Sequence, residues 1–230
     1  MFLPWAGLFE QIRLADVFVH YDDVQMPRGR SFMSRVQIKT PRGSQWLSAS
    51  IDHGRSGSLI SETFLAADRS WRERHLNLLR QNYGEAEHFE VMIDIAEMLY
   101  SQSDVNLAAF NRFAVEHLAQ WLKLDTQFGA SSTLGIPGSG TARLIDICRH
   151  YGASEYITGH GARNYLDHEA FEDNSIKVSY MDYGIRPYRQ LHGEFTSYVT
   201  ILDAIANLGD SARDILTSRT ADWRQFLESD

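Results

Sequence analysis

Residues 126–159, TQFGASSTLGIPGSGTARLIDICRHYGASEYITG, decide the expected fold. They indicate a short strand, then a helix over 142–152 that ends at a glycine, then a second strand over 154–159. Another strand is expected over 176–183. Strands separated by a helix favour parallel pairing, because the helix returns the chain to the edge where the first strand began. The sequence therefore predicts an α/β fold, with a mainly parallel sheet flanked by helices.

Elements on the amino side of this stretch extend the prediction. An apolar face indicates a helix over residues 5–14, and VFVHYDD, residues 17–23, reads as a strand. The turn Pro41-Arg42-Gly43 joins two strand patterns, at 31–40 and 44–51, into a β-hairpin. LISETFLA, residues 59–66, is a further strand candidate.

The longest helical region lies at residues 70–123. Ser70 and Glu73 have the spacing of a capping box, and apolar residues then recur at three- and four-residue steps over 88–102 and 104–123. No strand pattern separates these helices. We expect a helical insertion at about 70–123 within a single domain that spans 1–230.

Composition excludes several classes of protein. The chain has 22 Lys and Arg against 30 Asp and Glu, which gives a net charge of −8 and argues against nucleic-acid binding. No apolar stretch reaches the roughly 18 residues that a membrane span needs. Cys148 is the only cysteine, so it has no disulfide partner within the chain, which fits a cytoplasmic location. The expected ligand is a small molecule.

Asp22 and Asp23 are the first candidate site residues, because they end a predicted strand. In open α/β sheets, ligands bind at the carboxyl ends of strands. Both are candidate catalytic residues, and one of these carboxylates is expected to bind a sugar hydroxyl, an amine or Mg²⁺, or to deprotonate an acceptor amine. The alternative is that they form a turn that closes the strand.

Basic residues follow this acidic pair. Arg28, Arg30, Arg35 and Lys39 suit recognition of a phosphate or carboxylate, and the alternative is a solvated loop. The glycine-rich run 134–141 offers backbone N–H groups to an anion, although Ser139 or Thr141 acting as a helix N-cap explains the same pattern.

A second glycine-containing segment follows the strand at 154–159. Gly159 allows close approach of a ligand to the backbone, His160 is a candidate general base, and Asn164 and Tyr165 are candidate substrate-binding residues. The histidines show no metal-ligand spacing, so no metal site is predicted. Asp203 lies in an apolar helix, where we expect it to be hydrogen-bonded.

Several motifs occur together in one order along the chain. They are LPWAGLFEQIRLADVFVHYDDVQ (3–25), SRVQIKTPRG (34–43), RLIDICRHYGASEYITG (143–159), PYRQ (187–190) and FTSYVTILDAIANLG (195–209). This set resembles the WbqC-like family of bacterial O-antigen and polysaccharide clusters. The resemblance adds Pro4, Trp5, Gln25, Tyr188 and Gln190 to the expected substrate-binding residues, and it selects Arg35 among the arginines.

The resemblance implies a transferase of surface-polysaccharide or glycoconjugate biosynthesis, including transfer of glycine or another acyl group to an amino sugar. A nucleotide sugar is one substrate that fits it. The family usually begins with an apolar strand ahead of the Pro-Trp segment, which here follows directly on Met1-Phe2-Leu3. Two alternatives stay open, a HUP-like nucleotide-binding enzyme and a non-catalytic partner in glycan assembly. The sequence leaves cofactor and oligomeric state open.

Overall fold

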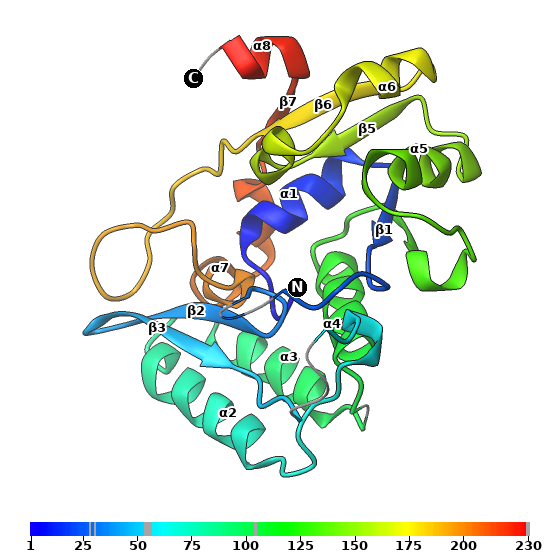
Figure 1. The fold of residues 1–230 in the computed structure, drawn as a ribbon. Helices are drawn as coiled ribbons and strands as arrows, with labels where there is room; N and C mark the ends of the chain where they lie inside the picture. Colours follow the sequence, from blue (N-terminus) through cyan, green and yellow to red (C-terminus); the bar gives the residue numbers. More distant parts are fainter. Residues whose placement is uncertain (28, 30, 53–56, 104, 229–230) are drawn as a thin grey trace.

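A computed structural model describes residues 1–27, 29, 31–52, 57–103 and 105–228 of the chain. It contains both helices and strands, which alternate along the chain from β4 to α8 (Figure 1). The helices are α1 (Ala6–Leu14), α2 (Ser70–Tyr83), α3 (Phe89–Ser101), α4 (Leu107–Trp121), α5 (Gly140–His150), α6 (His168–Asp173), α7 (Ile201–Leu208) and α8 (Trp223–Glu228). None of these described helices is long and apolar enough to cross a bilayer.

The strands form three small sheets. They are β1 (Val17–His20), β2 (Arg35–Thr40), β3 (Gly43–Ser48), β4 (Gln127–Ala130), β5 (Glu155–Thr158), β6 (Lys177–Asp182) and β7 (Arg219–Asp222). β1 pairs with β4 and β5 pairs with β6, both in parallel, while β7 is antiparallel to β6. β2 and β3 form the expected hairpin. The α/β class is confirmed, but β4 pairs with β1 rather than with β5, the next strand along the chain.

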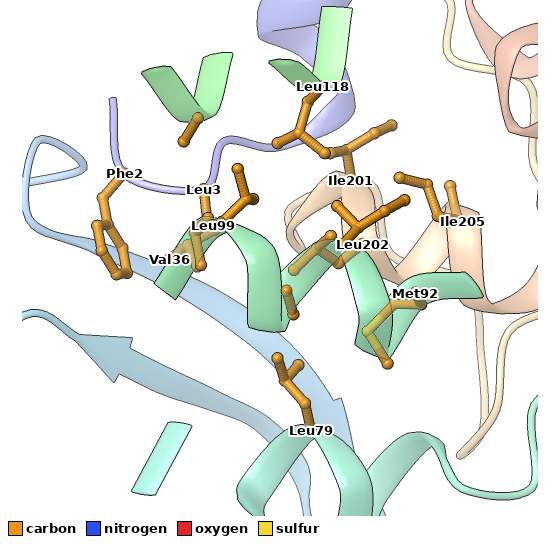
Figure 2. Close-up of a cluster of buried hydrophobic side chains, with 14 of the residues drawn as sticks. Phe2, Leu3, Val36, Leu79, Met92, Leu99, Leu118, Ile201, Leu202 and Ile205 are labelled. Atoms are coloured by element: carbon orange, nitrogen blue, oxygen red, sulfur yellow. The ribbon is translucent and has the colours of Figure 1, made fainter. Parts of the chain in front are cut away.

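The larger hydrophobic core lies between α1, the hairpin, the three helices α2–α4, and α7. Figure 2 shows side chains from β2, α2, α3, α4 and α7 that point toward one another, with Phe2 and Leu3 at one end. Phe2 is fully buried, and its ring stacks on Phe110 of α4 at 5.6 Å. The helices expected at 70–123 are therefore present and form much of this core.

The smaller core is built by α5, α6, β5 and β6, with side chains from α8 packed against it. Tyr180 of β6 is fully buried, and it stacks on Phe226 of α8 at 4.2 Å. Phe171 of α6 stacks on Tyr156 of β5 at 5.0 Å. α1 lies close to both β1 and β5, at the boundary between the two cores (Figure 1).

Residues 59–66 do not form the expected strand. They contain a 3-10 turn, Ile60–Glu62, and isolated bridges that join Leu59 to Gln25 and Leu65 to Ile51. The backbone N–H groups of Ile60 and Ser61 donate to the carbonyls of Val24 and Asp22. The segment thus uses its backbone groups to hold the loop that follows β1.

Candidate functional site

A cavity of about 670 Å³ lies between β1 and β5, and we call it the β1–β5 cavity. Its walls come from α1, β1, α5 and β5. The volume falls in the range of about 300–1,000 Å³ that is usual for small-molecule sites. One end of the cavity lies at the carboxyl ends of the parallel strands, where ligands of α/β sheets bind. This end is lined by Tyr21, Val24, Ser139, Gly140 and Tyr165, and we call it the mouth.

Asp22 lies directly after β1 and is almost fully buried. Its Oδ1 accepts a hydrogen bond from the backbone N–H of Ser132 at 3.0 Å. Its Oδ2 accepts from the Ser132 hydroxyl and from Arg112 Nη1, each at 3.1 Å. The Ser131 Oγ accepts from the backbone N–H of Asp22 at 3.2 Å. A carboxylate with this many donors anchors the end of β1 to the end of β4.

Asp23 makes the link to α5. Its carboxylate accepts hydrogen bonds from Ser131 Oγ and from Arg143 Nη2. Burial by itself raises the pKa of Asp23, but the bonds from Arg143 and Ser131 outweigh it, so that the pKa lies below its ordinary value. Arg143 is 5% exposed, and its guanidinium lies 5.1 Å from the ring centre of Tyr21. We call the side chains of these two paragraphs the Asp22–Asp23 cluster: Asp22, Asp23, Arg112, Ser131, Ser132 and Arg143.

The glycine-rich run prepares the amino end of α5. Gly138 and Gly140 have φ angles of +96° and +61°, which glycine adopts without strain. Ser139 occupies the N-cap position, but its side chain makes no capping hydrogen bond. The Thr141 hydroxyl instead accepts from the backbone N–H of Asp167. The first turn of α5 therefore presents backbone N–H groups that the Ser139 side chain does not cap, beside the mouth of the cavity.

The segment after β5 contributes Tyr165 to the mouth, whereas His160 packs on Tyr183 and on Phe226 of α8. Tyr165 lines the cavity although it is 65% exposed. His160 Nε2 donates to the carbonyl of Met181 at 2.7 Å, which leaves Nδ1 without the proton in the neutral ring. Gly159 lies so close to Tyr183 that a Cβ there would be 2.7 Å from its hydroxyl oxygen. Asn164 is exposed at the end of the following turn.

The Pro-Trp segment forms a separate aromatic group. The Trp5 ring packs on Tyr198 at 5.6 Å and on Tyr183 at 5.3 Å. A Cβ at Gly7 would lie 2.3 Å from the Trp5 ring, so glycine is required there. Pro4 is buried, and its carbonyl accepts from the backbone N–H of Ile201. This segment therefore joins the start of the chain to α7.

Tyr188 and Gln190 belong to a third group, inside the larger core. The hydroxyl of Tyr188 donates to Asp203 Oδ1 at 2.6 Å, and Gln190 donates to that hydroxyl at 3.0 Å. Tyr83 donates to Asp203 Oδ2 at 2.9 Å. Asp203 is fully buried and hydrogen-bonded, as expected from its place in an apolar helix. We call Asp203 with Tyr83 and Tyr188 the Asp203 cluster.

Two other predicted residues lie away from the cavity lining. The guanidinium of Arg35 stacks on the Trp46 ring at 3.8 Å, across the hairpin. Gln25 is exposed and bridges to Leu59. Arg28 and Arg30 lie outside the described residues. Of these predicted residues, Tyr165 lines the β1–β5 cavity, while Asp22 and Asp23 lie between two residues of its lining, Tyr21 and Val24. Trp5, Tyr188 and Arg35 lie in other parts of the molecule.

Sequence reasoning missed four members of the Asp22–Asp23 cluster. Ser131 and Ser132 follow β4 directly, and Arg143 lies in the first turn of α5. Their positions next to a strand end and a helix start could have identified them as candidate site residues. Arg112 projects from the middle of α4 and carried no local signal.

A smaller cavity of about 250 Å³ adjoins the other side of β1. It is lined by Met1, His20, Asp22, Asn111 and Arg112 among others. Burial lowers the pKa of His20 to about 4, with further lowering by the Met1 ammonium and Arg112 and an opposing effect of Asp22.

The sequence matches the WbqC-like protein family over residues 1–215. The chain belongs to the WbqC-like protein family. A curated relative, the uncharacterized protein Rv1507c of Mycobacterium tuberculosis (strain ATCC 25618 / H37Rv), is 34% identical over 218 residues, which are 94% of each chain. No solved structure matches the sequence. In this WbqC-like protein, four matched motifs that sequence reasoning identified lie at β1, the hairpin, α5–β5 and α7.

Proposed function

We propose that this WbqC-like protein is a transferase of surface-polysaccharide or glycoconjugate biosynthesis, which binds an activated anionic donor at the mouth of the β1–β5 cavity. The mouth is the observation that supports this proposal. It combines the carboxyl ends of parallel strands, the uncapped first turn of α5 and two tyrosine rings. Backbone N–H groups at a helix start attract phosphate, and tyrosine rings offer a surface for a base or sugar.

The Asp22–Asp23 cluster has a positioning role in this proposal. Asp23 holds Arg143 at the start of α5, and Arg143 Nε donates to the carbonyl of Ile136 within the glycine-rich run. The carboxylates therefore fix the shape of the loop that would contact the anion. Asp23 accepts hydrogen bonds from Arg143 and Ser131, which hold its pKa below the ordinary value and make it a weak proton acceptor.

The proposed reaction transfers glycine or another acyl group to an amino sugar. The sugar amine would form a bond to the acyl carbon, the bond from that carbon to the activating group would break, and the activating group would leave as an anion. The amine proton would pass to His160 Nδ1, since Nε2 is bonded to Met181. The α5 N–H groups would stabilise the leaving anion.

Ligand-induced shifts of the melting temperature test the donor site. The panel is UDP-N-acetylglucosamine, GDP-mannose, ATP, and glycine with ATP. We expect at least one nucleotide-containing ligand to raise the melting temperature, because binding to the folded state alone stabilises it. A response to ATP without a response to sugar nucleotides would favour the HUP-like nucleotide-binding alternative. No response, with a glycan-cluster protein co-purifying, would favour the non-catalytic partner.

Two tyrosines provide a matched pair of variants. Tyr165 and Tyr198 are 65% and 63% exposed, but only Tyr165 of these two lines the cavity. Tyr165→Ala should weaken the binding of the stabilising ligand at least tenfold, while Tyr198→Ala should leave it within about twofold, since stacking on an aromatic ring contributes about 1–3 kcal/mol per base. If both variants bound the ligand with equal affinity, the mouth would not be the donor site.

A further inference from the structure

Four aromatic side chains from separate segments of the chain pack against one another in a row. The ring of Tyr198, just before α7, stacks on Trp5 at 5.6 Å, and Trp5 packs on Tyr183, just after β6, at 5.3 Å. Tyr183 packs against the edge of His160 at 4.9 Å. Figure 1 shows the start of α1, where Trp5 lies, between α7 and β5. We call these four side chains the aromatic row.

Two glycines make room for the rings of this row. A Cβ at Gly7 would lie 2.3 Å from the Trp5 ring, and a Cβ at Gly159 would lie 2.7 Å from the Tyr183 hydroxyl oxygen. A side chain at either position would displace the neighbouring ring. The close approach of both rings to the backbone therefore depends on two glycines that are far apart in sequence, which favours a built arrangement over a chance contact of surface side chains.

Tyr198 projects from an anchored backbone although its side chain is exposed. The residue is 63% exposed, whereas Val199 and Thr200, which follow it, are 2% and 1% exposed. Isolated β-bridges join Val199 to Gln37 and Thr200 to Trp5. The ring thus has one face on Trp5 and most of its remaining surface in solvent. A ring that is already fixed loses little conformational entropy when a ligand stacks on it.

The exposed part of the row suits a carbohydrate. A sugar ring has a face of C–H groups, which packs on an aromatic ring, and hydroxyl groups at its edge, which need hydrogen-bonding partners. Among the described residues, the hydroxyl groups of Tyr183 and Tyr198 make no hydrogen bond, so they are available to the hydroxyl groups of a sugar.

The surroundings of the row fit a protein partner less well. A protein partner usually covers a contiguous apolar patch on the order of several hundred Å². The exposed large aliphatic residues of the described chain are Val91 of α3 and Val105 before α4, and neither belongs to the row. The row therefore offers ring-sized contacts without an apolar patch around them.

The row ends at His160, the residue that receives the amine proton in the proposed reaction. His160 Nε2 is bonded to the carbonyl of Met181, so Nδ1 is free of a proton in the neutral ring. A sugar chain that stacks on Tyr198 and extends along the row would bring one of its later residues to this nitrogen. The row thus lies on the acceptor side of the reaction, whereas Tyr165 lies on the donor side, at the mouth.

We propose that the aromatic row binds the acceptor, and that this acceptor is an oligosaccharide rather than a single amino sugar. The acceptor role rests on the proposed function, but the binding of an oligosaccharide does not. Tyr198 stacks on one sugar ring, and Trp5 supports the Tyr198 ring from below. The amine of a sugar further along the chain lies at His160, where it bonds to the acyl carbon and passes its proton to Nδ1, while the activating group leaves with its bonding electrons.

Saturation-transfer NMR tests the binding of the sugar chain. The probes are β-1,4-linked tetramers of glucose, of N-acetylglucosamine and of glucosamine. The first two are neutral, so the net charge of −8 on the protein does not attract them. Irradiation of the aromatic protons should transfer saturation to the C–H protons of at least one neutral tetramer, and the matching single sugar should bind more weakly. Binding of the glucosamine tetramer alone would indicate charge attraction and overturn the proposal.

Variants of two exposed tyrosines locate the binding. Tyr198→Ala should weaken the binding of the tetramer by about fivefold to tenfold, the loss expected for one aromatic contact, and Tyr198→Phe, which keeps the ring, should lose less than about twofold. Tyr165→Ala is the matched control, because Tyr165 is 65% exposed but lines the mouth. It should bind the tetramer as the wild-type protein does. Titration with the donor should give the reverse pattern for the two alanine variants.

The imidazole signal of His160 reports the other end of the row. Its assignment follows from its loss in His160→Gln. Addition of the tetramer should shift this signal in the wild-type protein, and in Tyr198→Ala the same shift should require a correspondingly higher concentration. The signal of His150, which is exposed at the end of α5, should not move.

Four further results would overturn the proposal. No neutral tetramer binds at millimolar concentration, or Tyr198→Ala and Tyr198→Phe bind it equally well, or the tetramer binds without shifting the His160 signal. In the fourth, the wild-type protein is a dimer that Tyr198→Ala dissociates, which would assign the row to contact between two copies of the chain. None of these measurements uses a donor, so the aromatic row and the donor site at the mouth fail or survive separately.

Discussion

The protein has two groups of buried or half-buried aspartates, and they differ in the side chains that donate hydrogen bonds to the carboxylates. The Asp203 cluster lies in the larger core, where Asp203 is fully buried and bonded by two tyrosine hydroxyls. The Asp22–Asp23 cluster lies beside the β1–β5 cavity, where Arg112 and Arg143 pair with the carboxylates. Burial raises the pKa of Asp203, whereas Arg143 and Ser131 hold the pKa of Asp23 low against the effect of burial.

The difference separates a structural role from a site-forming role. Asp203 is bonded by neutral donors, and burial raises its pKa against the effects of these hydrogen bonds and of Lys39. Arginine donors keep Asp23 ionised and fix the loop at the start of α5. We therefore expect changes in the Asp203 cluster to affect folding most, and changes in the Asp22–Asp23 cluster to affect ligand binding as well.

Truncation of Asp203 has the largest expected effect. Asp203→Ala removes the oxygen atoms that accept hydrogen bonds from Tyr83 and Tyr188. Each buried hydroxyl that loses its acceptor should lower the free energy of unfolding by about 1–3 kcal/mol. Urea unfolding should show a loss of about 3 kcal/mol or more. Asp203→Asn keeps one acceptor oxygen and should lose clearly less. Equal losses for the two variants would show that the hydrogen bonds of Asp203 contribute little.

Truncation of Asp22 should cost less. Asp22→Ala leaves Arg112 without its partner, but that side chain is 33% exposed and can be hydrated. We expect a loss of about 1–3 kcal/mol in urea unfolding. The double variant with Arg112→Ala should lose less than the sum of the two single losses, because the two side chains interact. A strictly additive double variant would contradict this ion pair.

His20 and Asp203 predict opposite changes of stability in acid. The lowered pKa of His20, about 4, means that the unfolded chain binds the extra proton between about pH 6.5 and pH 4. Its stabilising contribution is present above pH 6.5 and is lost as the pH falls, by up to about 1.4 kcal/mol per pH unit. Asp203, with a raised pKa, binds the extra proton in the folded state, so its contribution grows as the pH falls.

Chemical denaturation between pH 7 and pH 4.5 measures these slopes. His20→Gln should make the loss of stability in acid shallower than in the wild-type protein, and Asp203→Asn should make it steeper. His150→Gln, at an exposed position, is the control and should keep the wild-type slope. If His20→Gln and Asp203→Asn changed the dependence of stability on pH in the same direction, the opposite effects expected for His20 and Asp203 would be contradicted.

Replacement of Asp23 by asparagine has the smallest expected effect on stability. The Asp23 side chain is 21% exposed, and an amide oxygen still accepts a bond from Arg143. Asp23→Asn should therefore cost less than about 1 kcal/mol. The variant should nevertheless bind the stabilising ligand at least fivefold more weakly in a titration, because Arg143 is held less firmly at the start of α5. An unchanged affinity would show that Asp23 has a structural role and does not contribute to ligand binding.

The sequence predicted the regular elements well where a local pattern exists. The helices at 70–123, the hairpin and the strand–helix–strand order all occur, since each has its own apolar period or turn. The expected strand at 59–66 is wrong, because its backbone groups bond to the loop after β1 instead of to a strand. β7 and α8 were missed, since Arg219–Asp222 has no alternating pattern.

The site was predictable only in part. Asp22, Asp23 and Tyr165 were identified by their places at strand ends, and the structure places them at one cavity or beside it. The partners Arg112 and Arg143 come from helices distant in sequence, and pairing of that kind has no local signal. Tyr188 and Gln190 were expected to bind substrate, and the structure places them against Asp203 in the core. That placement is set by tertiary packing, which single-sequence patterns do not encode.

Hydrogen exchange with the stabilising nucleotide-containing ligand tests the central claim, that the mouth of the β1–β5 cavity holds the donor. Exchange is compared between the free and the saturated protein by mass spectrometry. The account predicts slower exchange in peptides covering 21–25, 136–143 and 157–165, with no change around Arg35 or Asp203. Protection confined to the hairpin or to α7, with the start of α5 unaffected, would contradict it.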